Sequence, residues 1–552
     1  MEKKSLTKSG LLLCGLLASE GFVNSVRAQG TQATVAPDAA MTAQCTKLAT
    51  ISIPAKVITL PTSGAHVTQA SVASANGSSY CKVTGVISPA SAGAPDIRFE
   101  ADLPFTWNGK ALQFGGGGYN GVIPNTASWS ALGLRSAPPP LAQGYLTFGD
   151  DSGHQAKDPN DASFAVNDEA MRNYAYMHIK KARDATFVLA QEFYGKTPRR
   201  LYFAGGSTGG REALTAAVRW PHDYAGVIAN YPTQNFTGLR LWGGKLADAL
   251  YANNSAGWIP SSLIDKITQS SMAACDELDG LKDGIVSNMQ ACRAGSPQRL
   301  KAFACPPGST SSDCLTPAQL DTIAVYHDGY VAGPKVKALI PSSGGYNILE
   351  GAAMSVGTNP IPAEPLIDGQ SAHHSARADQ FMKFFIAKDP AYHLLSVEFD
   401  EPGPWAEKVH EVTTVINPGL DGWDAYVKAG GKVLLLQGND DVSVSPNENT
   451  AYHKAIRTKL GEARADAFMR FYLIPGLGHG IGTFLINWDN VGTLDTWVEK
   501  NTPPPAMPVG YDTNSKNGNR SRPLCAYPSW PQYKGTGAVS DAASFTCAQG
   551  KY

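Results

Sequence analysis

The stretch Leu201-Tyr202-Phe203-Ala204-Gly205-Gly206-Ser207-Thr208-Gly209-Gly210-Arg211 decides the fold. Its first residues are apolar and predict a buried strand, and the segment from Glu212 to Trp220 predicts a helix. Between them stands Gly-x-Ser-x-Gly, the pattern of a sharp turn that exposes a nucleophilic serine above a sheet. Glycines are required there because the turn strains the backbone and bulky neighbours would clash. This order of strand, turn and helix predicts an α/β-hydrolase fold.

The same pattern has a second interpretation, because a chain with 56 glycines can contain Gly-x-Ser-x-Gly by chance. The turn would then carry an ordinary serine. A nucleophile needs a base, an acid and donors for an oxyanion, and the rest of the chain must supply them. Ser207 is the candidate nucleophile. The backbone N–H of Thr208, at the start of the following helix, is a candidate oxyanion donor.

Length and charge narrow the class of protein. With 552 residues the chain exceeds one ordinary domain and can bury a large core. Lys+Arg (46) and Asp+Glu (47) balance, and no basic block is present, so we expect no nucleic-acid partner. Hydrophobic residues make up 43% of the chain, as in folded globular proteins. We expect no organic cofactor, and the sequence leaves the oligomeric state open.

The amino terminus predicts a secretory signal peptide over residues 1–28. A basic start is followed by a short apolar run from Gly10 to Ala18, and Val26-Arg27-Ala28 forms a small-residue cleavage site. The apolar run is too short to span a bilayer, and no later stretch is long and apolar enough for a membrane helix. We therefore expect a secreted or periplasmic protein that is cleaved near Ala28.

Eight cysteines remain after such cleavage. An even number of cysteines in an exported chain argues for disulfides, with free buried thiols as the alternative. The cysteines form couples that are close in sequence, which suggests a pairing that sequence alone leaves open. The suggested pairs are Cys45–Cys81, Cys275–Cys292, Cys305–Cys314 and Cys525–Cys547.

A run of four glycines follows a predicted strand, one strand-rich block before the serine. The apolar residues Ala111 to Phe114 lead directly into Gly115-Gly116-Gly117-Gly118. A flexible turn is one interpretation. The other is a loop that brings a backbone N–H close to the nucleophile, because only glycines permit so close an approach. Gly117 and Gly118 are the candidate oxyanion donors.

The order of the predicted elements divides the chain. After a loose amino terminus over 29–44, strands and helices alternate as in a mainly parallel sheet covered on both faces. From about Thr233 to Gly419 this alternation gives way to helical pieces, glycine turns and prolines, and it resumes at Lys432. We therefore expect a catalytic domain formed by 29–234 and 420–552. Residues 235–419 would form an inserted lid that shapes the substrate pocket.

An acid and a histidine follow the serine in the order found in α/β hydrolases. The predicted strand over 433–437 leads to Asp440 and Asp441, either of which could orient an imidazole at the carboxyl edge of the sheet. An Asx turn that ends the strand is the alternative for at least one of them. His479 lies in a small-residue loop after the last predicted strand and is the candidate base, with a surface loop histidine as the alternative.

These motifs together resemble the tannase and feruloyl esterase family of secreted α/β hydrolases. The resemblance runs from about Cys45 to Cys547, and its G-x-x-D spacing from Gly438 implies that the acid is Asp441. The shared motifs are Gly115–Gly118, Asp151–His154, Phe193–Gly195, Gly205–Arg211, Pro475–His479 and Trp497–Glu499.

The sequence departs from the family pattern at two positions. The family usually has a cysteine immediately before the nucleophile and another immediately after the histidine, joined by a disulfide. Gly206 and Gly480 occupy these positions here. Both cysteines are absent, so no orphan thiol remains, and hydrolysis does not need the sulfurs chemically.

The resemblance also implies a structural calcium ion in the insertion, within residues 275–285. Closely spaced aspartates and glycines offer the hard oxygen ligands that calcium prefers. Two Asp-Gly turns are the alternative interpretation. The ligands carried over by position are the side chains of Asp276, Asp279 and Asp283 and the carbonyl oxygens of Leu281 and Ile285.

The resemblance implies a serine carboxylic-ester hydrolase that acts on small-molecule esters of aromatic acids, either feruloyl and other hydroxycinnamoyl esters or galloyl esters. A mono(hydroxyethyl) terephthalate-type hydrolase is the alternative within this class. Its substrate carries a free carboxylate, so we expect a cationic clamp in the insertion, with Arg377 as a candidate. A secreted binding protein on an inactive hydrolase scaffold is the hypothesis from another class.

Aromatic side chains of the insertion have two interpretations. They could clamp a substrate ring, or they could pack in a helical core. The residues concerned are Phe381, Phe384, Phe385 and Trp405.

Overall fold

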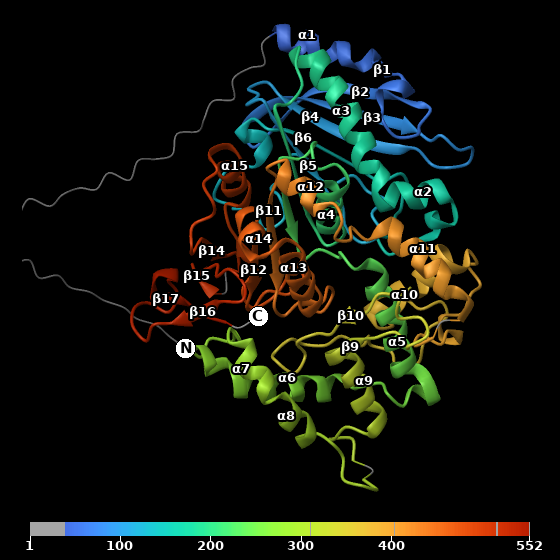
Figure 1. Ribbon diagram of the computed structural model, residues 1–552, viewed down its shortest axis with the longest axis vertical. Helices are drawn as coiled ribbons and strands as arrows, with labels where there is room; N and C mark the ends of the chain where they lie inside the picture. Colours follow the sequence, from blue (N-terminus) through green and yellow to red (C-terminus); the bar gives the residue numbers. More distant parts are fainter. Residues whose placement is uncertain (1–38, 310, 402, 515–516, 551–552) are drawn as a thin grey trace, which may run out of the picture.

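A computed structural model of the chain describes residues 39–309, 311–401, 403–514 and 517–550 (Figure 1). The predicted signal peptide, residues 1–28, lies outside the described residues. Among the helices that are described, none has the length and apolar character needed to cross a membrane.

A ten-stranded sheet forms the centre of the molecule, with the strand order β1-β2-β3-β4-β6-β5-β7-β8-β11-β12. The pairs from β6 to β12 are parallel, and those from β1 to β6 are antiparallel. The strands span Ser52–Ile53 (β1), Gly64–Ala75 (β2), Ser78–Ser88 (β3), Ile97–Pro104 (β4), Lys110–Phe114 (β5), Leu146–Asp150 (β6), Arg200–Gly206 (β7), Gly226–Asn230 (β8), Lys432–Gly438 (β11) and Met469–Ile474 (β12). The predicted α/β class with a mainly parallel sheet is confirmed.

Helices cover both faces of the parallel strands. Every residue of β5, β6 and β8 is buried, as expected for strands enclosed between two helical layers. Alternate residues of β11 enter two different cores: Val433 and Leu435 pack with α3 (His178–Tyr194) and α4 (Thr208–Arg219), whereas Leu434 and Leu436 pack with α15 (Asn490–Lys500). This alternation follows from the period of two along a strand.

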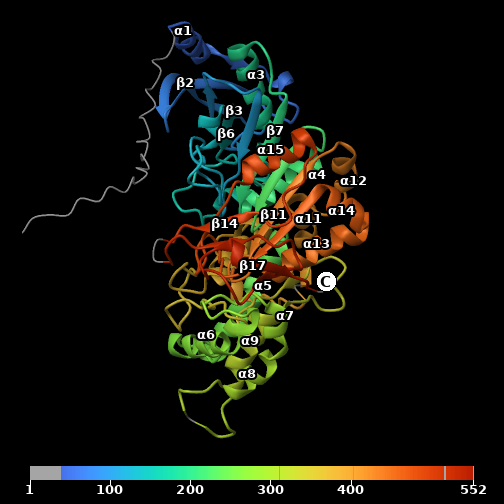
Figure 2. The same ribbon diagram turned by 90° about the vertical axis from the view of Figure 1, so that its left-hand side faces the viewer.

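The insertion lies between β8 and β11, and its buried residues share one core with buried residues of the segment 119–175. Figures 1 and 2 show α6, α8 and α9 gathered beyond one end of the sheet. Phe381 and Phe385 are buried in this core, so helical packing is their role, as one of the two interpretations predicts. The helices span Phe236–Ser255 (α5), Ser261–Cys275 (α6), Met289–Ala294 (α7), Ser296–Ala302 (α8), Pro317–Asp328 (α9), His373–Gln380 (α10) and Ala406–Ile416 (α11).

Four disulfides connect the cysteines in the suggested pairs. They are Cys45–Cys81, Cys275–Cys292, Cys305–Cys314 and Cys525–Cys547. The last of them joins the loop after β15 (Ser521–Pro523) to β17 (Phe545–Ala548), in the small antiparallel sheets near the carboxyl terminus.

The expectation of a loose amino terminus over 29–44 is wrong from Ala39 onward. Residues 29–38 lie outside the described part, but helix α1 spans Ala39–Lys47. Cys45 is fully buried and is bonded to Cys81 in β3, which fastens this helix to the sheet. The covalent link orders a segment whose own composition predicts little structure.

Candidate active site

Ser207 occupies the turn between β7 and α4. Its backbone has φ 58° and ψ −121°, a strained conformation for a residue with a side chain. The turn is held by hydrogen bonds: the N–H of Ser207 donates to the carbonyl of Asn230 over 3.0 Å, and its own carbonyl accepts from the N–H of Arg211 over 3.1 Å and of Thr233 over 3.2 Å. The predicted sharp turn is present.

The glycines around Ser207 allow three backbone segments to meet. A Cβ atom on Gly205 would come within 2.4 Å of the carbonyl oxygen of Gly209. One on Gly209 would come within 2.7 Å of the carbonyl oxygen of Gly116. Strand, helix and glycine loop therefore contact one another directly, and any larger residue would separate them.

His479 and Asp441 form a hydrogen-bonded pair beside this turn. The Nδ1 atom of His479 lies 2.8 Å from the Oδ2 atom of Asp441. Asp441 is fully buried, and its Oδ1 atom accepts the N–H groups of Ser443 and Val444 over 2.7 and 2.8 Å. These bonds fix the carboxylate, which in turn orients the imidazole. The Nε2 atom of His479 makes no hydrogen bond to any described residue.

The neighbouring aspartate, Asp440, is placed differently. Its Oδ1 atom is buried without a hydrogen-bond partner in the described chain, and burial raises the pKa of its carboxyl group to about 7. It makes no contact with His479 that would orient the imidazole. The geometry therefore favours Asp441 over Asp440 as the acid.

Ser207 and His479 line one cavity of about 540 Å³. Residues from the loops of the sheet and residues from the insertion meet there. Besides these two, the cavity is lined by Phe114, the four glycines Gly115–Gly118, Ala131, Pro159, Ala204–Gly206, Thr208, Tyr231, Thr233, Leu239, Arg240, His373, Arg377, Ser443 and Val444. Arg377, the predicted cationic residue, thus faces the same cavity as Ser207, and Arg240 and His373 accompany it.

The glycine loop presents free N–H groups to this cavity. The N–H of Gly115 donates to the carbonyl of Ala204, and that of Gly116 donates to the Oε2 atom of Glu212, each over 3.0 Å. In the described residues no hydrogen bond engages the N–H groups of Gly117, Gly118 or Thr208. These three groups are therefore available to stabilise a negative oxygen in the cavity.

The carboxylate of Glu212 supports the glycine loop by accepting the N–H of Gly116, a role that the sequence motifs did not predict. The residue is fully buried in α4, and its Oε1 atom accepts a hydrogen bond from Asn120 over 2.6 Å. His178 lies between this carboxylate and Asp150, 3.5 and 2.7 Å from them. Burial alone would lower the pKa of His178, but the two carboxylates raise it to about 10. A charged imidazole therefore balances Glu212 beneath the glycine loop.

Tyr231 fills the space between Gly206 and Gly480. A Cβ atom on Gly206 would come within 2.6 Å of the tyrosine ring, and the atom nearest to a Cβ on Gly480 would be the Tyr231 hydroxyl, at 3.7 Å. The ring centroid lies 4.6 Å from that of His479. An aromatic side chain thus occupies the place where the family resemblance implies a disulfide, and it packs against the imidazole directly.

The segment with the predicted calcium ligands forms a closed turn. Asp276 accepts the N–H groups of Gly284 and Ile285 over 3.0 and 3.2 Å, and Asp283 pairs with Arg522 over 2.5 Å. Burial raises the pKa of Asp279 to about 6. The oxygen chemistry suits calcium, but across the described ranges no group of three or more His, Cys, Asp or Glu side chains is arranged to hold a metal ion.

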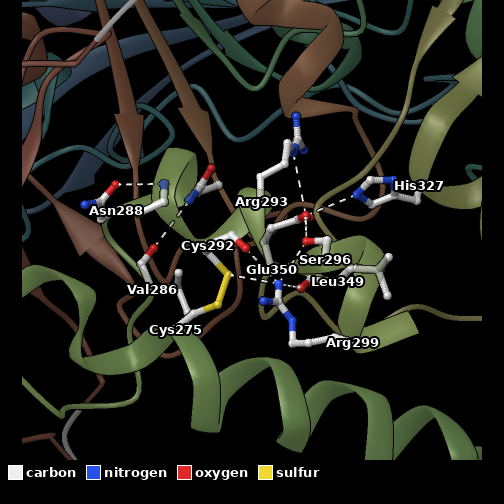
Figure 3. Close-up of a disulfide and its surroundings, with 12 residues drawn as sticks. Cys275, Val286, Asn288, Cys292, Arg293, Ser296, Arg299, His327, Leu349 and Glu350 are labelled. Atoms are coloured by element: carbon white, nitrogen blue, oxygen red, sulfur yellow. Dashed lines mark hydrogen bonds and ion pairs between the residues drawn. A yellow bond between two sulfur atoms is a disulfide. The ribbon is translucent and has the colours of Figure 1, made fainter. Parts of the chain in front are cut away.

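The Cys275–Cys292 disulfide anchors this segment to its surroundings (Figure 3). Arg299 donates to the carbonyl oxygens of Cys292 and Leu349 over 2.9 and 2.7 Å. On the other side, Asn439 donates to the carbonyl of Val286 over 3.5 Å. Because Asn439 is only two residues before Asp441, the anchored segment supports the loop that carries Asp441.

A profile of tannase and feruloyl esterase sequences matches residues 81–548. The chain belongs to the tannase and feruloyl esterase family. It is a carboxylic-ester hydrolase of that family, as the resemblance implies.

Two named proteins are similar to the chain over most of their length. The chain is 50% identical over 514 residues to an uncharacterized esterase of Agrobacterium fabrum, covering 91% of this chain and 93% of that protein. It is 28% identical over 529 residues to the mono(2-hydroxyethyl) terephthalate hydrolase of Piscinibacter sakaiensis, covering 85% of each.

Two solved structures of similar proteins confirm the fold. The crystal structure of feruloyl esterase B from Aspergillus oryzae matches with a TM-score of 0.73 at 22% identity, over 92% of this chain and 100% of that chain. The tannin acyl hydrolase from Aspergillus niger matches with a TM-score of 0.63 at 18% identity, over 88% and 90%. The chain therefore shares the α/β-hydrolase fold with an inserted helical region with these two enzymes.

Proposed function

We propose that the protein is an exported serine esterase that hydrolyses esters of aromatic acids. The observation that carries the proposal is the His479–Asp441 hydrogen bond on the wall of the cavity that Ser207 lines. His479 takes the proton of Ser207 as the hydroxyl attacks the ester carbonyl. Asp441 holds the imidazole in the tautomer whose Nε2 atom accepts that proton, and it stabilises the imidazolium that forms.

Negative charge develops on the carbonyl oxygen during this attack. The N–H of Thr208 and the N–H of Gly117 or Gly118 are the donors that would stabilise it. Their freedom from other hydrogen bonds in the described residues supports this role. His479 then returns its proton to the leaving alcohol, and a water molecule, activated by the same imidazole, cleaves the acyl-enzyme.

Feruloyl or other hydroxycinnamoyl esters and galloyl esters are the proposed substrates. The cavity of about 540 Å³ is within the size range of small-molecule sites and can hold an aromatic ester. The names of the solved relatives, a feruloyl esterase and a tannin acyl hydrolase, support the same class. A terephthalate half-ester is the second candidate, favoured by the cationic side chains that face the cavity.

A substrate panel tests the proposal. We expect measurable kcat/KM for at least one of methyl ferulate, chlorogenate, methyl gallate and mono(2-hydroxyethyl) terephthalate. Ser207→Ala should abolish turnover while the circular dichroism spectrum and Tm stay those of the parent protein. A serine-directed phosphonate should label Ser207, as shown by peptide mass spectrometry. Turnover by the Ser207→Ala protein would refute the nucleophile, and absence of both labelling and turnover would favour an inactive scaffold that only binds its ligand.

Export and calcium binding belong to the same proposal. Four disulfides are typical of proteins outside the reducing cytoplasm, which supports the predicted signal peptide. Calcium would be structural, bound by the carboxylates of the segment around Asp279, and no step of the hydrolysis needs it. Cell fractionation with mass determination of the mature amino terminus tests the predicted cleavage near Ala28.

A further inference from the structure

The carbonyl of Gly118, in the glycine loop, accepts hydrogen bonds from two hydroxyl groups. The hydroxyl of Thr208 donates to it over 2.5 Å, and the hydroxyl of Tyr174 donates over 3.1 Å. Thr208 begins helix α4, whereas Tyr174 belongs to a π-helical turn, Asn173–Met177, directly before α3. Turns of this kind are rare and occur often at functional sites. Two helices that are separate in the chain therefore hold the same peptide group.

The peptide groups on both sides of the Gly118 Cα atom are held by hydrogen bonds. The N–H of Tyr119 shares one planar group with the Gly118 carbonyl, and it donates to the carbonyl of Pro159 over 2.7 Å. In the preceding group, the carbonyl of Gly117 accepts the N–H of Asn120 over 2.8 Å. Because that group is trans, the N–H of Gly118 points away from this bond, and it makes no hydrogen bond in the described chain.

Gly118 alone connects these two peptide groups. Its φ is 62°, in the left-handed region that favours glycine. A Cβ atom here would come within 2.5 Å of the carbonyl oxygen of Pro159, so the position has no room for a side chain. Glycine is also the residue that changes its torsions most easily, and the two hydroxyl groups oppose that freedom. The orientation of the Gly118 N–H therefore depends on Thr208 and Tyr174.

Tyr174 is itself fixed by its surroundings. It is fully buried, and the centre of its ring lies 6.0 Å from those of Phe236 and Phe385 in the insertion. The guanidinium of Arg211 lies 4.9 Å from the ring centre and donates to the backbone carbonyl of Tyr174 over 3.1 Å. Burial raises the pKa of the phenol, so the hydroxyl keeps its proton and remains a donor. The aromatic core of the insertion is thus connected to the glycine loop.

Thr208 reaches the same carbonyl from the other side of the loop. Its backbone N–H is one of the free donors of the cavity, and its hydroxyl holds the loop that presents the others. Thr215, further along α4, shows the more usual use of such a hydroxyl, since it donates to the carbonyl of Arg211 in its own helix over 2.8 Å. Thr208 instead donates to a residue that lies 90 positions earlier in the chain.

We propose that the hydroxyl groups of Thr208 and Tyr174 position the glycine loop for oxyanion stabilisation by holding the carbonyl of Gly118. This inference rests on the proposed esterase function, and it makes both side chains positioning residues that act through the loop. Hydrogen-bond donors stabilise a transition state most when they are oriented before the reaction. Loss of either hydroxyl should therefore lower kcat and leave KM nearly unchanged.

Thr208→Val and Tyr174→Phe each remove one hydroxyl and keep the size of the side chain. For the ester of the panel with the highest kcat/KM, we expect kcat to fall by about 10-fold or more in each variant, with KM within about threefold of the parent value. Thr208→Ser keeps the hydroxyl and should recover most of the kcat that Thr208→Val loses. The double variant should lose more than the product of the two single losses, because only there is the carbonyl left without both donors.

The matched controls are Thr215→Val and Tyr194→Phe. Each removes a hydroxyl that donates to a backbone carbonyl over 2.8 Å, and neither residue lines the cavity. We expect both controls to keep the kcat and KM of the parent protein. Their Tm values show how much stability is lost when such a hydrogen bond is removed away from the glycine loop.

A mimic of the tetrahedral intermediate tests the same inference without turnover. Phenylboronic acid forms a tetrahedral adduct with a nucleophilic serine, and its inhibition constant should rise in Thr208→Val by about the factor by which kcat falls. An active parent protein whose kcat is unchanged in Thr208→Val, Tyr174→Phe and the double variant would overturn the inference and leave the esterase standing. A loss through KM alone would also count against it. A parent protein with neither turnover nor boronate binding would overturn the esterase and this inference together.

Discussion

Tyr231 is the residue whose position the sequence motifs give no reason to expect. Its ring fills the space between Gly206 and Gly480 and packs on the imidazole of His479. The hydroxyl makes no hydrogen bond to a described residue, so the contribution of Tyr231 is the shape of its ring. A side chain that restricts the imidazole of the proposed base acts on the geometry of proton transfer more than on substrate binding.

We predict that Tyr231→Ala lowers kcat by about 10- to 100-fold with a smaller change in KM, because the imidazole loses the surface that holds it. Tyr231→Phe should retain most of the activity. The exposed Tyr511 provides a control substitution, Tyr511→Ala. The measurement is kcat/KM as a function of pH. If Tyr231 positions the imidazole of His479, the acid limb of the pH profile shifts in Tyr231→Ala. If Tyr231→Phe loses as much activity as Tyr231→Ala, the hydroxyl matters and the packing argument is wrong.

Glu212 gives a second prediction at the same scale. In Glu212→Gln the amide cannot match both Gly116 and the charged His178, so the glycine loop loses part of its support. We expect kcat to fall by about 10-fold while KM for a neutral ester changes little, since oxyanion stabilisation acts in the transition state. Steady-state kinetics with methyl ferulate would show it, and a rise in KM alone would contradict this account.

At the scale of elements, sequence motifs predicted several parallel strands and the glycine turns, but they did not predict every strand of the sheet. Strands β5, β7 and β11 were predictable because they are short apolar runs that end in glycines. Strand β2 was not, because its small and polar residues give no apolar alternation at a partly exposed position of the sheet.

The residues of the candidate site likewise divide into those that a local sequence motif predicts and those that no local motif predicts. Ser207, Asp441 and His479 stand in local motifs that can be recognised in one sequence. Arg240, Glu212 and Tyr231 reach the site through tertiary packing, and no local signal distinguishes them from ordinary helix or loop residues.

The calcium segment yields a prediction about stability. If calcium binds the carboxylates around Asp279, its addition to chelator-treated protein should raise Tm, because an ion that binds only the folded chain stabilises it. Asp279→Asn should remove that increase, and Asp265→Asn, on helix α6, serves as the control. Differential scanning fluorimetry with and without calcium makes the comparison. An unchanged Tm in the parent protein would mean that the Arg522–Asp283 pair and the hydrogen bonds of Asp276 hold the turn closed without calcium.

At the scale of the whole molecule, buried carboxyl groups couple stability to pH. Asp102 is fully buried in the sheet, and burial raises the pKa of its carboxyl group to about 7, against the opposing hydrogen bond from Thr126. Between about pH 4 and pH 7 the unfolded chain releases this proton and the folded chain keeps it. The free energy of unfolding that this group contributes is therefore complete below pH 4 and is lost as the pH rises toward 7.

We predict that Asp102→Asn reduces the loss of stability between pH 4.5 and pH 7.5 by about 3 kcal/mol relative to the parent protein. Urea denaturation at the two pH values measures the difference. Asp96→Asn, at an exposed aspartate, is the control and should leave the pH dependence unchanged. An identical pH dependence in Asp102→Asn and the parent protein would show that Asp102 ionises in the folded chain as it does in the unfolded one.

The packing of Tyr231 has a consequence for how the site responds to reducing conditions. None of the cysteines in the four disulfides lines the cavity. The turns that carry Gly206 and Gly480 therefore meet through the tyrosine ring, and no sulfur–sulfur bond between them is open to a reductant. A reductant would act on the site only from a distance, through the Cys275–Cys292 bond and the segment that supports the Asp441 loop.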